Sequence, residues 1–289
     1  MSSIDAMNAP APMPTARYAV IGHPVAHSQS PFIHTQFAQQ TGEAIEYGRI
    51  DCGPNGFAAA LRAFADSGAA GCNVTVPFKF EAAALAAVCS ERARLAGAAN
   101  TLRLDAGGWL ADNTDGVGLR RDIEQGAGFA LAGRRVLLIG AGGAGAGVLG
   151  PLLEARPGEL VLVNRSAGRP QALVERHASL ARACDVVLRT APLAAPGQGF
   201  DLVINASASS LQGAAVPVPR GALAQKGLGV DLMYGPPAQG FLDWATQQGA
   251  QARDGLGMLV EQAAEAFFLW RGVRPQAAPV LQALRARLA

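Results

Sequence analysis

Short runs of aliphatic and β-branched residues alternate with longer Ala- and Leu-rich stretches from Arg17 to the end of the chain. The short runs are typical of buried strands, and the longer stretches are typical of helices. Regular alternation of the two predicts an α/β fold with mainly parallel sheets, because helices that connect parallel strands cover the faces of the sheet.

The predicted strands fall into two series, so we expect two sheets. The first series has strands at 18–21, 45–50, 72–76 and 101–104, with helices at 31–40, 57–65 and 81–88. The second has strands at 135–139, 160–163, 186–188, 202–204 and 229–232. Two further helices, at 258–270 and 279–288, have no strand after them, and we expect them to pack back on the first domain.

A glycine-rich turn follows the first strand of the second series. Gly140, Gly142 and Gly145 fit the pattern G-x-G-x-x-G at a strand-to-helix junction. The first glycine permits the tight turn, the second lets the backbone approach a pyrophosphate, and the third allows close helix packing. A flexible glycine loop is the alternative, and Pro151 is expected to kink the helix. The pattern predicts a doubly wound, Rossmann-type dinucleotide-binding domain.

The next strand ends in Asn164 and Arg165, with Arg169 shortly after, where an NAD-binding protein would place an Asp or Glu. A carboxylate would repel a ribose 2′-phosphate, whereas two guanidinium groups would bind it. The sequence therefore predicts NADP rather than NAD, unless both arginines are solvated loop charges.

The domain boundaries follow from these patterns. The first domain, with a mainly parallel sheet, is predicted at 15–116 and is completed by the C-terminal helices at 255–289. The dinucleotide-binding domain is predicted at 117–254, and a turn-rich segment at 112–116 begins the hinge. Residues 1–14 contain three prolines and are predicted to be a flexible tail.

Composition narrows the class of protein. Of 289 residues, 50% are hydrophobic and 16% are charged, with a net charge of +2, which disfavours both disorder and nucleic-acid binding. The uncharged stretch 136–153 contains six glycines and Pro151, which fits a strand and glycine turn better than a membrane span. Four cysteines without metal-ligand spacing are expected to be reduced thiols in a cytoplasmic protein. His23 and His27 lack further ligands, so no metal site is predicted.

Two segments of the first domain are candidates for chemistry. Lys79 is predicted in the first turn of a helix, where a cation opposes the helix dipole and calls for a partner. Asp115 is the acidic candidate, and together they could move a proton to or from a carbonyl oxygen. A surface lysine would fit the residues around Lys79 equally well. Ser28 and Ser30 are spaced to line one wall of a site, although Ser30 would also suit a helix cap.

Seven segments taken together resemble the shikimate dehydrogenase family, in the right order and from about Arg17 to the end: 22–31, 73–79, 97–101, 112–116, 140–144, 164–165 and 254–263. The resemblance implies NADPH-dependent, reversible reduction of 3-dehydroshikimate to shikimate in the biosynthesis of chorismate and the aromatic amino acids. It implies a substrate-binding first domain and a soluble monomer or homodimer that binds no membrane.

The resemblance also implies roles for individual residues. Lys79 and Asp115 would be the catalytic pair. Substrate would be bound by Asp115 together with Ser28, Ser30, Asn73, Thr75, Asn100, Tyr234 and Gln262. The cofactor NADP would be bound by Gly140, Ala141, Gly142, Gly143, Ala144, Asn164, Arg165, Arg169, Leu232 and Gly255, with Glu91 nearby. The chain departs from the family pattern at Ala146, Ser207 and Ser210, on the cofactor side.

Two alternatives compete with this interpretation. One is a quinate/shikimate dehydrogenase that uses NAD, against which Arg165 and Arg169 argue. The other is a non-catalytic NADP-sensing protein on the same fold, which would be expected to have lost Lys79 or Asp115. Both residues are present.

Overall fold

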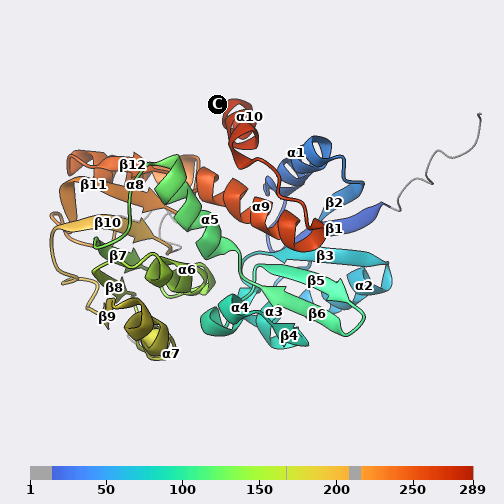
Figure 1. The fold of residues 1–289 in the computed structure, drawn as a ribbon, viewed down its shortest axis with the longest axis horizontal. Helices are drawn as coiled ribbons and strands as arrows, with labels where there is room; N and C mark the ends of the chain where they lie inside the picture. Colours follow the sequence, from blue (N-terminus) through green and yellow to red (C-terminus); the bar gives the residue numbers. More distant parts are fainter. Residues whose placement is uncertain (1–14, 167, 208–215, 289) are drawn as a thin grey trace, which may run out of the picture.

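The computed structural model describes residues 15–166, 168–207 and 216–288. These residues form two six-stranded sheets and the helices that pack on them. Figure 1 shows the sheets at opposite ends of the molecule, with helices between them. The predicted tail at 1–14 lies outside the described residues. No helix in the described ranges is long and apolar enough to cross a membrane.

The first sheet has the strand order β2-β1-β3-β5-β6-β4. Its strands are β1 (Ala16–Gly22), β2 (Ile45–Asp51), β3 (Ala69–Val74), β4 (Val88–Cys89), β5 (Thr101–Asp105) and β6 (Gly108–Asp112). Strands β2, β1 and β3 are mutually parallel, whereas β5 runs antiparallel to both β3 and β6. The sheet carries helices α1 (Ser30–Thr41), α2 (Phe57–Asp66), α3 (Lys79–Leu85) and α4 (Glu91–Ala96).

The second sheet is parallel throughout and has the order β12-β11-β10-β7-β8-β9. Its strands are β7 (Arg135–Ile139), β8 (Glu159–Val163), β9 (Val187–Thr190), β10 (Phe200–Asn205), β11 (Leu223–Asp231) and β12 (Gln251–Arg253). Helices α6 (Gly143–Glu154), α7 (Gly168–Cys184) and α8 (Gln239–Gln247) accompany it. This is the doubly wound order, in which successive strands are added first on one side of β7 and then, from β10, on the other. Ligands bind at the point where the strand order reverses, here between β7 and β10. The predicted α/β class is confirmed.

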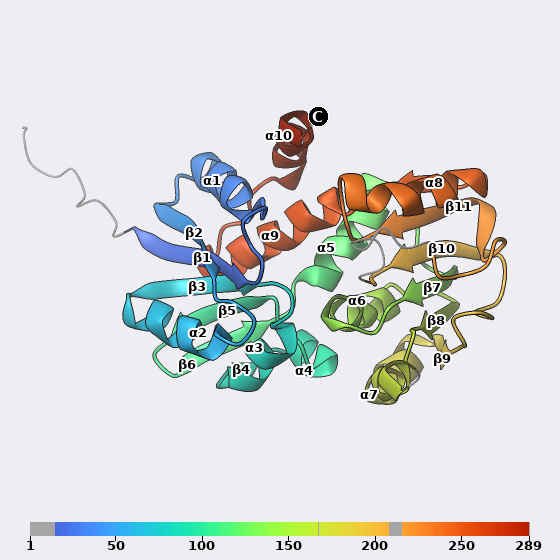
Figure 2. The same ribbon diagram turned by 180° about the vertical axis from the view of Figure 1, so that it is seen from behind.

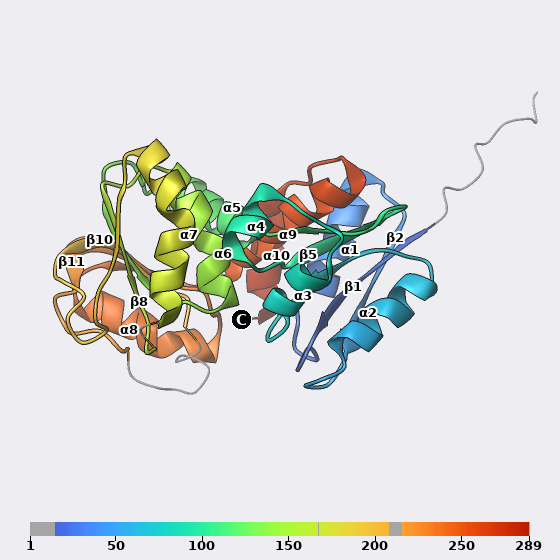
Figure 3. The same cartoon turned by 90° about the horizontal axis from the view of Figure 1, so that it is seen from below.

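Helices α5 (Asp115–Arg121) and α9 (Leu256–Arg271) pack side by side between the sheets (Figures 1 and 2). Figure 3, seen from below, shows α4 and α6 in the same middle layer, where they are in contact. The last helix, α10 (Ala277–Leu288), packs on α9 and α1. Apolar side chains of α1 and α9 share one core, and Trp270 donates a hydrogen bond of 3.0 Å to the Leu102 carbonyl. The expected return of the C-terminal helices to the first sheet is confirmed.

Several local predictions were wrong. The helix expected at 81–88 starts earlier, at Lys79, and ends at Leu85, because Val88 and Cys89 pair with β6. The turn expected at 112–116 is instead divided between the end of β6 and the start of α5. The strands β4, β6 and β12 were not predicted: β4 and β12 have only two and three residues, and β6, with the sequence GWLAD, has no clear alternation.

Pro151 does not end helix α6, which continues to Glu154. A proline cannot donate to the carbonyl four residues earlier, which is that of Gly147. That carbonyl and the Pro151 ring both lie against Gly116, where an added Cβ would be 2.6 Å from each. The irregular turn of α6 therefore provides the surface on which α5 packs.

We expect acid sensitivity from His34, a fully buried residue of α1 stacked on Tyr47 with ring centroids 4.2 Å apart. Burial lowers the pKa of His34 to about 3. Between that value and about 6.5 the unfolded chain binds a proton that the folded chain does not, so stability falls as pH falls. Between pH 7 and 5 the loss is about 2 kcal/mol. In urea unfolding at both pH values, His34→Leu should show a correspondingly smaller difference, and an unchanged difference would contradict this assignment.

Candidate active site

A pocket of about 630 Å³ lies between the two sheets and takes residues from both. Its walls come from the loops after β1, β3, β7 and β11 and from helices α5 and α9. Most of the site residues predicted from the sequence are among its lining: Ser28, Ser30, Asn73, Thr75, Lys79, Asn100, Asp115, Gly142, Gly143, Ala144, Arg169, Leu232, Tyr234, Gly255 and Gln262. Residues far apart in the sequence thus share one cavity.

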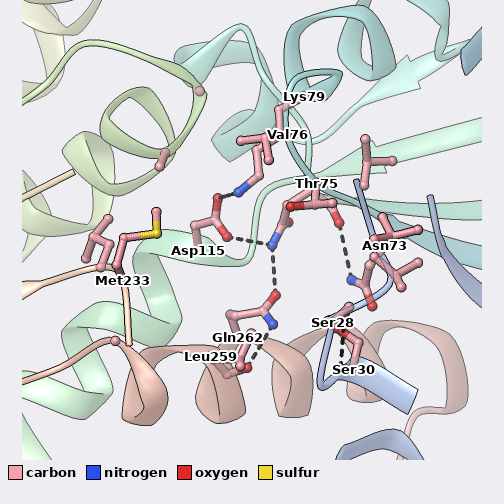
Figure 4. Close-up of a pocket in the computed structure, with 18 of the residues that line it drawn as sticks. Ser28, Ser30, Asn73, Thr75, Val76, Lys79, Asp115, Met233, Leu259 and Gln262 are labelled. Carbon is pink, nitrogen blue, oxygen red and sulfur yellow. Dashed lines mark hydrogen bonds and ion pairs between the residues drawn. The ribbon is translucent and has the colours of Figure 1, made fainter. Parts of the chain in front are cut away.

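Lys79 and Asp115 form an ion pair in this pocket (Figure 4). Each is the first residue of its helix, α3 and α5 respectively, and their side chains are 14% and 6% exposed. The stem of Lys79 also packs against the glycine turn, because a Cβ on Gly143 would lie 3.2 Å from the Lys79 Cβ. The ammonium group is therefore held where the first sheet meets the proposed dinucleotide site.

Asn100 organises the polar groups beside this ion pair. Its Nδ2 lies 2.9 Å from both Asp115 Oδ1 and Gln262 Oε1, and its Oδ1 accepts a 2.8 Å hydrogen bond from the Thr114 backbone. Gln262 in turn donates to the Leu259 carbonyl at 2.8 Å. Since every atom of the Asn100 amide has a partner, its orientation is fixed and so is that of the carboxylate.

Ser28 and Ser30 form one wall of the pocket, the serine wall, which comes from the loop between β1 and α1. Ser28 Oγ donates to Ser30 Oγ at 3.1 Å and accepts a 3.3 Å bond from the Ser30 backbone N–H. Helix α1 begins at Ser30 itself, with Gln29 at the N-cap position, so the capping role allowed for Ser30 is wrong. Tyr234 also lines the pocket, and burial raises its pKa, which keeps its hydroxyl protonated as a hydrogen-bond donor.

The glycine turn has the geometry that dinucleotide binding requires. Gly140 has φ +108°, which few other residues adopt, and a Cβ on Gly145 would lie 2.1 Å from the Gly140 carbonyl oxygen. Gly142 faces open space at the start of α6. Asn164 Oδ1 accepts a 3.2 Å hydrogen bond from the Ala141 N–H and so ties the turn to the end of β8. These residues fit a pyrophosphate group approaching the backbone.

Three residues predicted on the cofactor side differ in placement. Both arginines are exposed, but Arg169, in the first turn of α7, lines the pocket and Arg165 is not part of the lining. Glu91 is also outside the lining and forms a surface ion pair of 2.6 Å with Arg94. Among the departures from the family pattern, Ala146 packs in the apolar core, and Ser210 lies outside the described residues.

Other residues of the site were missed in the sequence. Met233, Met258 and Leu259 line the pocket but, being apolar, give no chemical signal. Behind the lining, Asp231 at the end of β11 is fully buried and accepts hydrogen bonds from the Met233 N–H at 2.8 Å and from Asn205 Nδ2 at 3.0 Å. An acidic residue at the end of an apolar strand is the feature of the sequence that could have indicated this hydrogen-bonded link between β10 and β11.

The doubly wound sheet, the glycine turn and the ion pair in one pocket define the class of this protein, a dinucleotide-dependent α/β oxidoreductase. Three family models match the chain: the shikimate dehydrogenase substrate-binding domain at 20–102, shikimate/quinate 5-dehydrogenase at 123–212, and the shikimate 5′-dehydrogenase C-terminal domain at 255–285.

Whole proteins match as well. The NADP(+) shikimate dehydrogenase of Acidovorax sp. (strain JS42) is 61% identical over 272 residues, covering 94% of this chain and 96% of its own. That of Methylibium petroleiphilum is 62% identical over 276 residues, covering 93% and 94%. The crystal structure of shikimate 5-dehydrogenase from Thermus thermophilus, with NADP(H) and shikimate, is 32% identical with a TM-score of 0.83, covering 95% and 100%. This chain belongs to the shikimate dehydrogenase family.

Proposed function

We propose that this chain catalyses the reversible, NADPH-dependent reduction of 3-dehydroshikimate to shikimate, a step in the biosynthesis of chorismate and the aromatic amino acids. The observation that carries the proposal is the Lys79–Asp115 ion pair, which lies in a pocket shared with the glycine turn. The relatives that match over nearly the whole chain are NADP(+) shikimate dehydrogenases, which supports the same reaction.

The proton is assigned to Lys79. NADPH, when bound, supplies the hydride that reduces the carbonyl carbon, and the carbonyl oxygen must then receive a proton. The Lys79 ammonium donates that proton, and the neutral Lys79 amine takes it back in the oxidative direction. Asp115 orients the ammonium through Oδ2, and Asn100 holds the same carboxylate through Oδ1 at 2.9 Å. The pair is nearly buried, so its charges are poorly screened by water and act strongly on a developing alkoxide.

Substrate recognition is assigned to the remaining polar groups of the pocket. The Ser28 and Ser30 hydroxyls and the protonated Tyr234 hydroxyl can donate to a carboxylate. The ring hydroxyls of shikimate would contact the other polar side chains of the lining: Asn73, Thr75, Asn100, Asp115 and Gln262. In this assignment the anionic group of the substrate meets hydroxyl donors rather than the Asp115 carboxylate.

NADP is assigned to the turn at 140–144 and to residues around it. Asn164, Leu232 and Gly255 would contact the cofactor, Arg169 would bind the 2′-phosphate, and Arg165 would add to the positive charge outside the pocket lining. Strand β8 ends at Val163 and is followed by Asn164 rather than by an acidic residue, so nothing at that position repels a phosphate. Glu91, paired with Arg94 at the surface, stays a weaker candidate for a place near the cofactor.

The organisation of the chain follows from these assignments. We place the substrate-binding and catalytic domain at 15–116, completed by 255–289, and the NADP-binding domain at 117–254. The protein is proposed to act in the cytoplasm as a monomer or homodimer. An NAD-dependent quinate/shikimate dehydrogenase is the competing function.

Absorbance at the nicotinamide band tests the proposal directly. Shikimate or quinate is combined with NADP or NAD in all four pairs, and kcat/KM is measured for each. We expect shikimate with NADP to be the best pair by at least 10-fold. Preference for quinate with NAD would replace the proposed function by the competing one.

Lys79→Ala should lower kcat by about 10² to 10⁴-fold with little change in the KM for shikimate, because acid–base groups contribute in that range. The sequence contains one other lysine, Lys226, which provides a matched control. Lys226 is exposed with φ +65°, a conformation that asparagine tolerates, so Lys226→Asn should keep wild-type kcat. A Lys79→Ala enzyme with near wild-type kcat across the pH range would move the proton to another group.

Replacing Arg165 and Arg169 together by Ala should raise the KM for NADP by about 10- to 100-fold and leave the KM for NAD unchanged, since hydrogen bonds to charged groups contribute about 1.5–3 kcal/mol. Arg182→Ala removes an exposed arginine near the other end of α7 and should change neither value. Equal losses for NADP and NAD would show that the arginines do not bind the 2′-phosphate.

A further inference from the structure

Strand β2 lies at the edge of the first sheet, and none of its residues lines the pocket. Alternate residues of a strand face the same side, which puts Tyr47, Arg49 and Asp51 in one row. Each of them reaches a group on or next to the serine wall: Tyr47 contacts Asn73, Arg49 contacts Ser28, and Asp51 contacts His23. One face of β2 therefore supports this wall from behind.

The Tyr47 contact holds the carbonyl end of the Asn73 amide. Asn73 Nδ2 donates to the Asn100 carbonyl at 3.2 Å, and a carbonyl can only accept, so the amide cannot be reversed. Its Oδ1 then accepts from the Tyr47 hydroxyl at 2.6 Å. Asn73 is 6% exposed, so removal of that donor would leave the acceptor without its partner in the interior. The phenol hydroxyl fixes an amide that the pocket uses.

The Arg49 contact holds the backbone of the serine loop. Its Nε and Nη2 both donate to the Ser28 carbonyl oxygen, at 3.1 Å and 2.6 Å. This two-point contact fixes the backbone of Ser28. The Ser28 hydroxyl donates a hydrogen bond to that of Ser30, and the two hydroxyls form the wall. The Ser28 carbonyl is neutral, so these bonds leave the positive charge of the guanidinium uncancelled beside the loop.

The pocket itself offers little positive charge to an anion at this wall. Lys79 and Arg169 are the Lys and Arg residues among the lining, and Lys79 is already paired with Asp115. Arg169 belongs to α7, on the side of the second sheet. Arg49 is therefore suited to supply positive potential to a carboxylate bound by Ser28 and Ser30.

We propose that β2 is a positioning strand for substrate recognition, in which Arg49 orients and charges the carboxylate-binding serine loop and Tyr47 orients Asn73. The inference rests on the proposed function, because it takes the substrate to be a carboxylate bound at the serine wall. Arg49 and Tyr47 act through Ser28 and Asn73 and touch no substrate. They set affinity for substrate and have no part in binding NADP.

Steady-state kinetics of Arg49→Met and Tyr47→Phe test this inference. Arg49→Met should raise the KM for shikimate about 5- to 20-fold, and Tyr47→Phe about 3- to 10-fold, which is within the range for loss of a buried or charge-assisted hydrogen bond. The KM for NADP should stay within twofold of wild type, and kcat should change less than the KM for shikimate.

The neighbouring strand β1 provides matched controls. Tyr18 is the register partner of Tyr47 but stacks on Trp270, away from the pocket lining. Arg17 donates to a backbone carbonyl at 2.8 Å, as Arg49 does, but to that of Ser67. Tyr18→Phe and Arg17→Met should leave the KM for shikimate within twofold of wild type, with thermal unfolding confirming that all variants are folded. If Arg49→Met does not fold, Arg49→Lys carries the same test, with an expected rise of at least threefold.

A double-mutant cycle separates positioning from general stabilisation. In a Ser28→Ala background, Arg49→Met should raise the KM for shikimate by a smaller factor than in wild type, because the hydroxyl that Arg49 positions is gone and only the effect of its charge on the carboxylate remains. An undiminished effect in that background, a KM within twofold of wild type for Arg49→Met alone, or an equal rise in the KM for NADP would each overturn the inference while the proposed function stands. A wild-type enzyme without activity on shikimate would overturn both.

Discussion

Close backbone packing of helix α5 against α9 and α6 is the constraint on which the site depends. Two glycines of α5 make it possible: a Cβ on Gly118 would lie 2.6 Å from the Gln262 backbone nitrogen, and a Cβ on Gly116 would lie 2.6 Å from the Gly147 carbonyl oxygen. Any larger side chain would push the helices apart. Because Asp115 begins α5 and Gln262 belongs to α9, this packing brings the carboxylate, the amide and the glycine turn of α6 into one pocket.

Charged groups secure the same layer further along its helices. Glu265 of α9 accepts hydrogen bonds from Arg92 at 3.2 Å and Arg121 at 2.8 Å and pairs with Arg274 at 2.8 Å. Burial raises the pKa of this carboxyl, but the hydrogen bonds from Arg274 and Arg121 outweigh it and bring the pKa below its usual value. Such a cluster contributes most by fixing orientation, because removal of the shared Glu265 carboxylate would leave three arginines without that partner. It ties α4, α5 and α9 together on one side of the pocket.

The division of labour in the pocket follows from the two sheets. Carboxyl ends of parallel strands meet at one edge, so each sheet delivers its polar loops to the same side. The first sheet presents the serine loop and Lys79, and the second presents the glycine turn and Tyr234. Lys79 lies against Gly143, at the point where the two sets of loops meet. A proton donor at this boundary can serve a reaction in which hydride arrives from one side and substrate is held on the other.

The sequence by itself determined the fold class, the glycine turn and the residues of the ion pair, because these depend on local periodicity and on motifs of fixed spacing. It could not place Arg165 and Glu91 outside the pocket lining: Arg165 lies in the loop after an expected strand, whereas Glu91 begins helix α4, which the sequence did not predict. It also missed Asp231, Tyr47 and Arg49, whose partners lie 26, 26 and 21 residues away in the chain. The strands β4, β6 and β12 were not predicted either. Tertiary structure alone decides these features, because a hydrogen bond across a sheet or between loops depends on which strands become neighbours, and residues 21 or 26 positions apart carry no local sign of that proximity.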